Sequence, residues 1–191
     1  MELYDAIMNR RSHRSYKPEM PPREALERVV QAALWAPSGM NDQAWEITVL
    51  AGSARDELVK LIDQAFTHLL PILKQLNFPK EGQQMLMKFF KDLGGAPVVM
   101  AVTIFRNPGD PSNFNNIQGG AALMQNLLLA AQAEGLGSCW MTGAHALEKE
   151  ILKFLGKSDQ QLLALTPIGY PAKDPPAPPR KPREVRWIGF A

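Results

Sequence analysis

Four residues near the N-terminus have the chemistry of an anion-binding site. Arg10, Arg11, Ser12 and Arg14 lie within five residues and directly follow a stretch with helical spacing. A guanidinium donates two parallel hydrogen bonds, which match the oxygens of a phosphate group. The cluster is therefore typical of a phosphate clamp. The alternative is a solvated basic helix end, where cations meet the negative end of the helix dipole.

A second polar group lies in the loop before a predicted strand. Ser38, Asn41 and Gln43 bring one hydroxyl and two amides together within six residues. Such groups can hydrogen-bond the edge of a heterocycle or a sugar-like chain. The alternative is an ordinary turn, in which the same groups bond their own backbone.

A third segment, residues 135–143, is rich in glycine and ends in Trp140, Met141, Thr142 and Gly143. It does not have the spacing G-x-G-x-x-G and it follows a helix, so it does not indicate a dinucleotide site of the Rossmann type. Its glycines allow backbone N–H groups to approach a ligand closely. Cys139 lies between small and apolar residues, and we expect a buried, unreactive thiol there.

A basic pair, Arg180 and Lys181, stands in a C-terminal tail that carries six of the 16 prolines in residues 171–191. A solvated charged tail is the simple interpretation. The tail, however, ends in apolar side chains that are not usually left in water, namely Trp187, Ile188 and Phe190. We therefore expect an extended arm that reaches a partner subunit.

The sequence lacks the patterns of several other mechanisms. His13, His68 and His145 are far apart, and none belongs to an H-E-x-x-H pattern. There is no G-x-S-x-G nucleophile elbow and no phosphate-binding P-loop. One cysteine excludes an intramolecular disulfide and a cysteine-clustered zinc site. We expect no metal, and an enzyme with this sequence would take its reactive group from a cofactor.

Helices and strands alternate along the chain and would position these groups. Apolar residues at helical spacing predict a short helix from Leu3 to the arginines, a second that ends before Pro37, and a third that Ser53 caps. Two more helices are predicted at about 116–134 and 147–155, strands at 45–49, 98–105 and 162–168, and a short strand followed by a turn at 137–143.

Two of these regions have unusual patterns. The helix at 116–134 is apolar around most of its circumference, which requires a large core or an oligomer interface. Residues 64–94 are helical but interrupted by Pro71, Pro79 and Gly82, and we expect them to form an excursion or lid over a site. Loop residues are expected from Asn107 to Asn116.

The order of elements predicts one α+β or α/β domain over residues 1–191. The net charge of +2 does not indicate a nucleic-acid partner. The longest apolar stretch, residues 121–133, is too short to span a bilayer, and the acidic, polar N-terminus does not resemble a signal peptide. We expect a soluble, cytoplasmic protein with no membrane partner.

Five motifs in this order resemble those of the nitroreductase family of flavin-dependent oxidoreductases. Residues 10–16 (RRSHRSY) are similar to R-R-S-x-R-x-[FY], and residues 37–45 (PSGMNDQAW) to P-S-x-x-N-x-Q-P-W. Residues 135–143 (GLGSCWMTG) resemble G-L-G-x-x-W-x-x-G, residues 168–171 match I-G-Y-P, and residues 180–182 match a closing basic pair. The resemblance covers nearly the whole chain, about residues 3–187.

The resemblance implies an α+β nitroreductase-like fold, with a central mixed, mainly antiparallel sheet flanked by helices. It further implies an intertwined homodimer with two FMN sites at the subunit interface. The implied activity is an FMN-dependent oxidoreductase that transfers hydride from NAD(P)H, through flavin N5, to a nitroaromatic, a quinone or a similar acceptor in a ping-pong sequence. No catalytic side chain is implied, because the flavin carries the chemistry.

The match also implies a role for each motif. Arg10, Ser12 and Arg180 would hold the FMN phosphate and ribityl chain, and Arg14 would lie near N1 and O2, where positive charge stabilises the reduced ring. The rest of the implied FMN site falls into three sets: Ser38, Asn41 and Gln43 from the partner subunit; Trp140, Met141, Thr142 and Gly143 along the ring near N5; and Arg11 and Lys181 beside the phosphate.

Two positions depart from the family pattern. Ala44 takes the place of the proline in the second motif, which implies a less rigid loop, and residues 64–94, the region that shapes the substrate pocket in the family, match no family pattern. Three alternative functions stay open: a non-catalytic module for flavin binding, storage or redox sensing, a deiodinase-like relative, and a flavin-cleaving relative.

Overall fold

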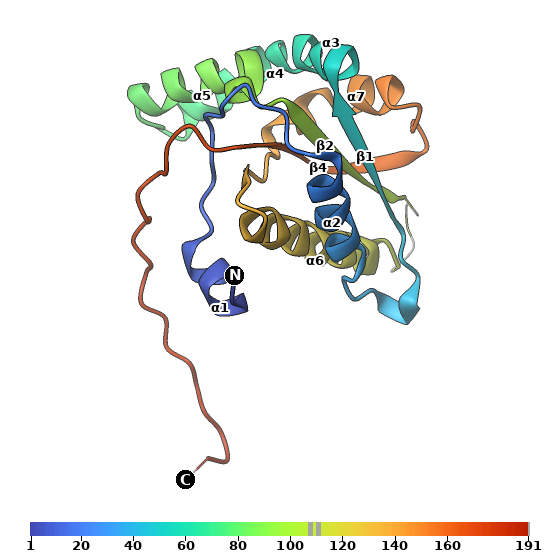
Figure 1. Ribbon diagram of the computed structural model, residues 1–191, viewed down its shortest axis with the longest axis vertical. Coiled ribbons are helices and arrows are strands. Elements are labelled where there is room, and N and C mark those ends of the chain that lie inside the picture. Colours follow the sequence, from blue (N-terminus) through green and yellow to red (C-terminus); the bar gives the residue numbers. More distant parts are fainter. Residues whose placement is uncertain (107–108, 110–111, 191) are drawn as a thin grey trace.

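A four-stranded antiparallel sheet lies between two layers of helices (Figure 1). The computed structural model describes residues 1–106, 109 and 112–190. The strands are β1 (Trp45–Ala51), β2 (Val98–Phe105), β3 (Gly137–Ser138) and β4 (Gln160–Gly169), in the spatial order β1-β2-β4-β3. One further bridge, between Ser12 and Ser138, is parallel. The predicted α+β class with a mainly antiparallel sheet is confirmed.

The centre of the sheet is β2, which pairs with β1 on one side and β4 on the other. Seven of its eight residues are buried, and the predicted bounds are correct. A continuous run of β-branched and apolar residues fits this position, because helices cover both faces of the sheet.

One face of the sheet is covered by α2 (Arg23–Leu34) and α6 (Ser112–Ala133), with the short α1 (Leu3–Asn9) beside α6. Within one chain α6 buries only the side that includes Leu123 and Leu127, while Gln125 is exposed and Leu129 is half-buried. The complete burial expected from its composition is therefore not reached inside a single chain.

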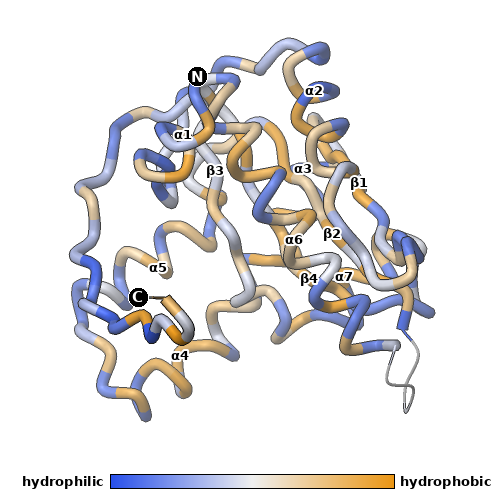
Figure 2. Tube along the Cα trace, turned by 90° about the horizontal axis from the view of Figure 1, so that it is seen from below, coloured by the Kyte–Doolittle hydropathy of each residue, from blue (hydrophilic) through white to orange (hydrophobic). Residues whose placement is uncertain are grey.

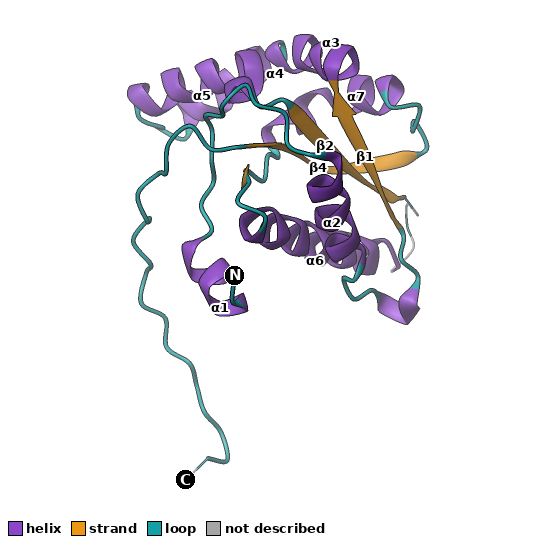
Figure 3. Ribbon diagram, viewed as in Figure 1, coloured by secondary structure: helices purple, strands orange, loops and turns teal. Residues whose placement is uncertain are grey.

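The opposite face is covered by α3 (Gly52–Asp63), α4 (Ala65–Gln75), α5 (Lys80–Asp92) and α7 (Glu148–Phe154) (Figure 3). This layer has its own apolar core, in which the ring of Phe90 contacts the rings of Phe66 and Phe89 at centroid distances of 6.2 Å. No helix of the described residues is long and apolar enough to cross a membrane.

Several predicted boundaries were wrong. Pro71 does not interrupt α4, because Phe66 and Leu73 bury this helix in the core and outweigh the loss of one backbone donor. Gly82 lies inside the first turn of α5, so the break between the two helices falls at residues 76–79 alone. Ser53 lies within α3, whose N-cap is Ala51.

The start of α6 was also predicted wrongly. The helix begins at Ser112, four residues before the predicted position, so the last part of the predicted 107–116 loop is helical. Residues 107, 108, 110 and 111 of that loop lie outside the described residues.

After β4 the chain continues as an extended tail that passes the N-terminal segment and α1 and then leaves the body of the molecule (Figures 1 and 3). Its end is coloured as hydrophobic in Figure 2. The exposed fractions are 71% for Trp187, 73% for Ile188 and 75% for Phe190. No part of the described chain buries these three side chains.

Candidate functional site

The N-terminal arm, residues 10–16, runs from α1 to the sheet and is fixed along its length. The His13 amide donates to the Ser138 carbonyl (2.9 Å), and the Tyr16 amide donates to the Gly94 carbonyl (2.8 Å). The buried Tyr16 hydroxyl donates to the His13 carbonyl at 2.7 Å. The arm therefore presents its arginines from a rigid backbone.

A tight turn at the end of α5 supports the arm at Arg14. Gly94 has a φ of +68°, and a Cβ atom built on it would lie 2.2 Å from the Arg14 carbonyl oxygen. The Gly94 amide donates to the Asp92 carboxylate (2.8 Å). Arg55 in turn donates to the carbonyls of Asp92 (2.6 Å) and Ala96 (2.9 Å). Only glycine allows this close approach.

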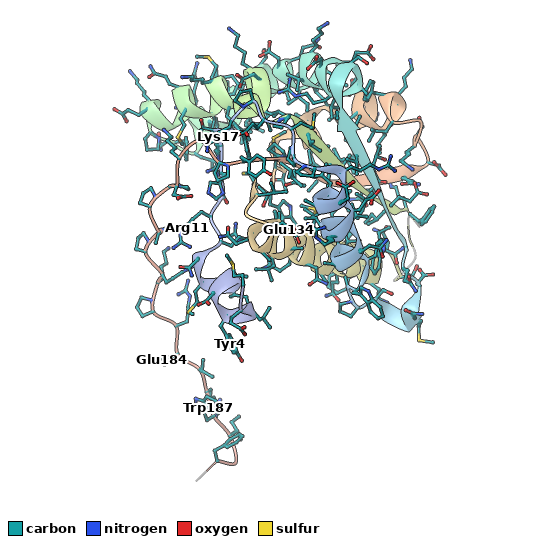
Figure 4. The ribbon with its side chains drawn as sticks, in the orientation of Figure 1. Tyr4, Arg11, Lys17, Glu134, Glu184 and Trp187 are labelled. Atoms are coloured by element: carbon teal, nitrogen blue, oxygen red, sulfur yellow. The ribbon has the colours of Figure 1, made fainter. Side chains whose placement is uncertain are left out.

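Arg10, Arg11 and Arg180 form a cationic cluster between α1 and the tail, and Figure 4 shows Arg11 at this place. Burial lowers the pKa of the Arg10 guanidinium; the nearby Cys139 opposes this shift, and the charges of Arg180 and Arg11 add to it. The ion pairs of the described residues include none of these arginines and not Arg14. Cations held together without a carboxylate form a site suited to an anion.

Cys139 links the arm to the glycine-rich segment. Its thiol is hydrogen-bonded to Ser12 and lies near the charges of Arg14 and Arg10. Burial nevertheless raises its pKa above the usual value, because this effect exceeds the three that lower it. The side chain is 2% exposed, so the predicted burial is confirmed.

Residues 140–143 lie between the sheet and α5. The backbone of Met141 exchanges hydrogen bonds with Leu165 at 2.9 and 3.1 Å. Gly143 packs so closely against Phe90 that an added Cβ would lie 2.6 Å from the ring. Trp140 is half-buried and Thr142 is exposed. The backbone N–H and C=O of Met141 are therefore paired within the chain, whereas the Thr142 side chain is open to solvent.

Ser38, Asn41 and Gln43 lie together in a strained loop. The Gln43 amide donates to the Ser38 hydroxyl (3.0 Å), and its side chain donates to that of Asn41 (3.1 Å). Met40, Asn41 and Gln43 have φ values of 53°, 56° and 48°, a left-handed conformation unfavourable for residues other than glycine. Met40 is 100% exposed. Strain of this kind occurs at ligand clamps and contact sites.

The loop and the arginine cluster lie at opposite ends of α6 (Figure 1). Gly39 contacts Asn115 at the start of that helix, whereas α1 lies against its last turns around Leu129 and Ala133. Since α6 has 22 residues, it is about 33 Å long. One chain brings Arg10, Arg11, Ser12, Arg14 and Arg180 together, but it does not bring the loop to them. Lys181 is exposed on the tail.

A cavity of about 310 Å³ opens between the arm, α5 and residues 173–175. Of the residues that line it, the sequence predicted Ser12 and Arg14 as part of the FMN site, but it did not predict Met85, Lys88, Phe89 and Lys173 as site residues. These four come from regions that match no motif. For the three on α5, the available signal was the prediction that residues 64–94 cover a site; Lys173 had no such signal.

The described residues contain no group of three or more side chains that could hold a metal ion.

A family model with the description "Nitroreductase family" matches residues 7–170. This range contains the arm, the 38–43 loop and residues 140–143.

Two curated proteins are similar over most of the chain. An iodotyrosine deiodinase of Thermotoga neapolitana is 29% identical over 193 residues, which cover 98% of this chain and 98% of that protein. A nitroreductase of Mycolicibacterium smegmatis is 27% identical over 192 residues, 86% of this chain and 80% of that protein.

Solved structures agree with these sequence comparisons. A BluB-like flavoprotein from Clostridium difficile is 27% identical with a TM-score of 0.74, covering 95% of each chain. An iodotyrosine deiodinase bound to FMN and 3-iodo-L-tyrosine is 26% identical with a TM-score of 0.76, covering 99% of this chain and 100% of that one.

Proposed function

Because the chain belongs to the nitroreductase family, we propose that it binds FMN and uses NAD(P)H to reduce a nitroaromatic, a quinone or a similar acceptor. The observation that carries the proposal is the cationic cluster of Arg10, Arg11 and Arg180, which none of the ion pairs of the described residues neutralises. Such a cluster fits the phosphate of FMN.

The residues around the cluster fit the rest of the cofactor. Arg10, Ser12 and Arg180 would hold the phosphate and ribityl chain, with Arg11 and Lys181 beside them. Arg14 would place positive charge near N1 and O2 of the ring. Its position is well defined, because its backbone rests against Gly94.

We propose that the active form is a homodimer, because the loop with Ser38, Asn41 and Gln43 lies at the far end of α6 from the arginines. A second copy can supply this loop to the site. The complete exposure of Met40 at the tip of the loop supports a contact with another chain.

When bound, FMN would supply the chemistry of hydride transfer from NAD(P)H, through N5, to the acceptor in a ping-pong sequence. Trp140, Met141, Thr142 and Gly143 would line the ring near N5. Cys139 keeps its proton at neutral pH, because burial raises the pKa of its thiol. No side chain of the site is therefore proposed as a nucleophile.

The visible spectrum of the purified protein tests the proposal. We expect a yellow protein with one FMN per subunit that is bleached by NAD(P)H and recovers its colour with a nitroaromatic. A colourless protein that takes up no FMN at micromolar concentration would contradict FMN binding. A flavin-loaded protein that NAD(P)H does not reduce would instead support a storage or sensing role.

A second candidate activity is reductive deiodination. The chain is 29% identical to an iodotyrosine deiodinase over 98% of its length. Release of iodide from 3-iodo-L-tyrosine by the reduced protein, measured beside reduction of a nitroaromatic, distinguishes the two activities.

A further inference from the structure

We propose that the cavity beside Arg14 selects acceptors in which an aromatic ring carries a carboxylate or another anionic group, and that Lys88 and Lys173 determine this specificity. The inference rests on the proposed function, because it concerns the acceptor of the same reaction. It adds two residues that lie outside every motif of the N-terminal arm, the loop and the glycine-rich segment.

The cavity has one apolar wall that suits a ring. Phe89 lies on the buried face of α5, and Met85 lies one helical turn before it on the same side of the helix. Pro175 of the tail completes this wall. Apolar and aromatic walls with a few placed polar groups are typical of small-molecule sites.

The rest of the lining is cationic. Lys88 and Lys173 stand against one carboxylate, that of Asp92, while Arg14, which also lines the cavity, is assigned to the FMN ring. The Asp92 side chain already accepts a hydrogen bond from the Gly94 amide at 2.8 Å, which holds it in the turn. The ion pairs among the described residues include neither lysine. An anion in the cavity would therefore give these cations a counter-charge that the chain does not supply.

The two lysines come from different elements, and each element is held in place. Lys88 lies on α5, which the buried Phe89 and Phe90 anchor in the core. Lys173 lies between two contacts of the tail with the arm. The Ala172 amide donates to the Ser15 carbonyl (3.0 Å), and Asp174 lies 3.3 Å from the His13 ring. Both lysines therefore line the cavity from elements whose backbones are held in place by contacts.

Ser12 and Arg14 line the same cavity and belong to the proposed FMN site, so the acceptor would lie beside the flavin, between α5 and residues 173–175.

The test compares 4-nitrobenzoate with 4-nitrobenzamide, which share the ring and nitro group and differ in charge. We expect the parent protein to favour the carboxylate. Lys88→Gln and Lys173→Gln should each raise KM for 4-nitrobenzoate about two- to fivefold and leave that for the amide within about twofold. Lys91→Gln is the matched control, since this exposed lysine lies on α5 outside the cavity lining.

A second measurement does not depend on turnover. Calorimetric titration of the oxidised, FMN-loaded protein with each compound should show that the parent binds the carboxylate more tightly than the amide. The two lysine variants should bind the carboxylate more weakly than the parent does. If the titration shows tighter binding of the carboxylate while NAD(P)H drives no reduction, the proposed function fails and the specificity of the cavity stands.

Three outcomes would overturn the inference. The first is a parent protein that binds the carboxylate and the amide equally. The second is loss of FMN affinity in the two lysine variants, which would place them in the cofactor site. The third is a raised KM for NADPH but not NADH, which would assign the cations to the phosphate of the donor.

Discussion

Without a bound anion, the arginines of the candidate site lie in surroundings that disfavour their positive charges. Burial and the charges of Arg180 and Arg11 all lower the pKa of Arg10, so the folded chain holds a charged group that its surroundings disfavour. An anion with two or more acceptor oxygens removes this penalty and gains charge-assisted hydrogen bonds. Binding of such an anion should also stabilise the fold.

Arg10→Ala should weaken FMN binding strongly. Loss of one charge-assisted contact costs about 1.5–3 kcal/mol, which is roughly a ten- to hundredfold loss of affinity. Titration of flavin fluorescence with the variant measures this change. Arg23→Ala is the control, because Arg23 pairs with Glu27 on the surface of α2 and should leave the affinity unchanged. An unchanged dissociation constant for Arg10→Ala would identify Arg10 as a solvated helix end.

Cys139→Ser should keep turnover within a few-fold of the parent. The raised pKa means that the thiol is protonated at neutral pH and less reactive than a free cysteine at any given pH. Alkylation by iodoacetamide should accordingly begin only at a higher pH than in a model peptide. Loss of NAD(P)H oxidation with FMN still bound would contradict a mechanism that needs no thiol.

Elements with strong local signals were predictable, and those set by tertiary contacts were not. The bounds of β2 follow from a run of eight residues, apolar except for Thr103, that ends at a polar loop. The polar first turn of α6 contains no apolar residue at helical spacing apart from Phe114, so its start was missed. The helix α4 continues through Pro71, because burial in the core outweighs local propensity.

The residues of the candidate site likewise include some that the sequence indicates and some that only the folded chain brings together. Arg10, Ser12 and Arg14 could be selected from the sequence, because residue type and spacing alone indicate an anion site. The lysines of the cavity could not, since Lys88 and Lys173 are 85 positions apart and meet only in the folded chain. The close approach of Gly94 to Arg14 is likewise a tertiary feature.

Gly94→Ala should displace the arm and weaken FMN binding. An added methyl group would overlap the Arg14 carbonyl, and both are backbone-bound and cannot rotate away. Gly156→Ala is a matched control, because Gly156 has a φ of +69° and nothing within 4 Å of its built Cβ. The control should lose about 1–2 kcal/mol from the left-handed conformation alone. Gly94→Ala should lose at least about 1 kcal/mol more.

Urea denaturation gives the free energy of unfolding of the two glycine variants, and flavin titration gives their affinity for FMN. Only the Gly94 variant should lose flavin affinity. Equal stability and equal affinity in the two variants would show that the turn at Gly94 does not support Arg14.

At the scale of the whole molecule, the single chain leaves an unusual amount of apolar surface in water. Exposed residues include Tyr4 on α1 and Trp187 in the tail, both labelled in Figure 4, and also Met8 on α1 and Met40 on the loop. Large apolar side chains exposed side by side, as at the end of the tail, mark surfaces that contact another molecule. A second copy of the chain would cover them and would bring the 38–43 loop to the arginine cluster.

The tail has the length and composition for such a contact. Its proline-rich part, residues 171–182, is extended and can reach about 37 Å at roughly 3.1 Å per residue. Each large apolar side chain at its end would gain roughly 1.5–3 kcal/mol from burial against a partner. If the two subunits share each FMN site, binding of the cofactor and association of the subunits are linked, and each must strengthen the other.

Deletion of residues 184–191 should therefore lower both dimer stability and FMN occupancy. Sedimentation velocity over a range of protein concentrations measures association, and flavin absorbance per chain measures occupancy. Glu184→Gln is the control, since it changes a charge in the deleted segment and keeps the apolar side chains. A truncated protein that remains a fully occupied dimer would refute a bridging arm. An intact protein that is monomeric with FMN bound would refute the shared site, because one chain would then hold the cofactor without the loop of its partner.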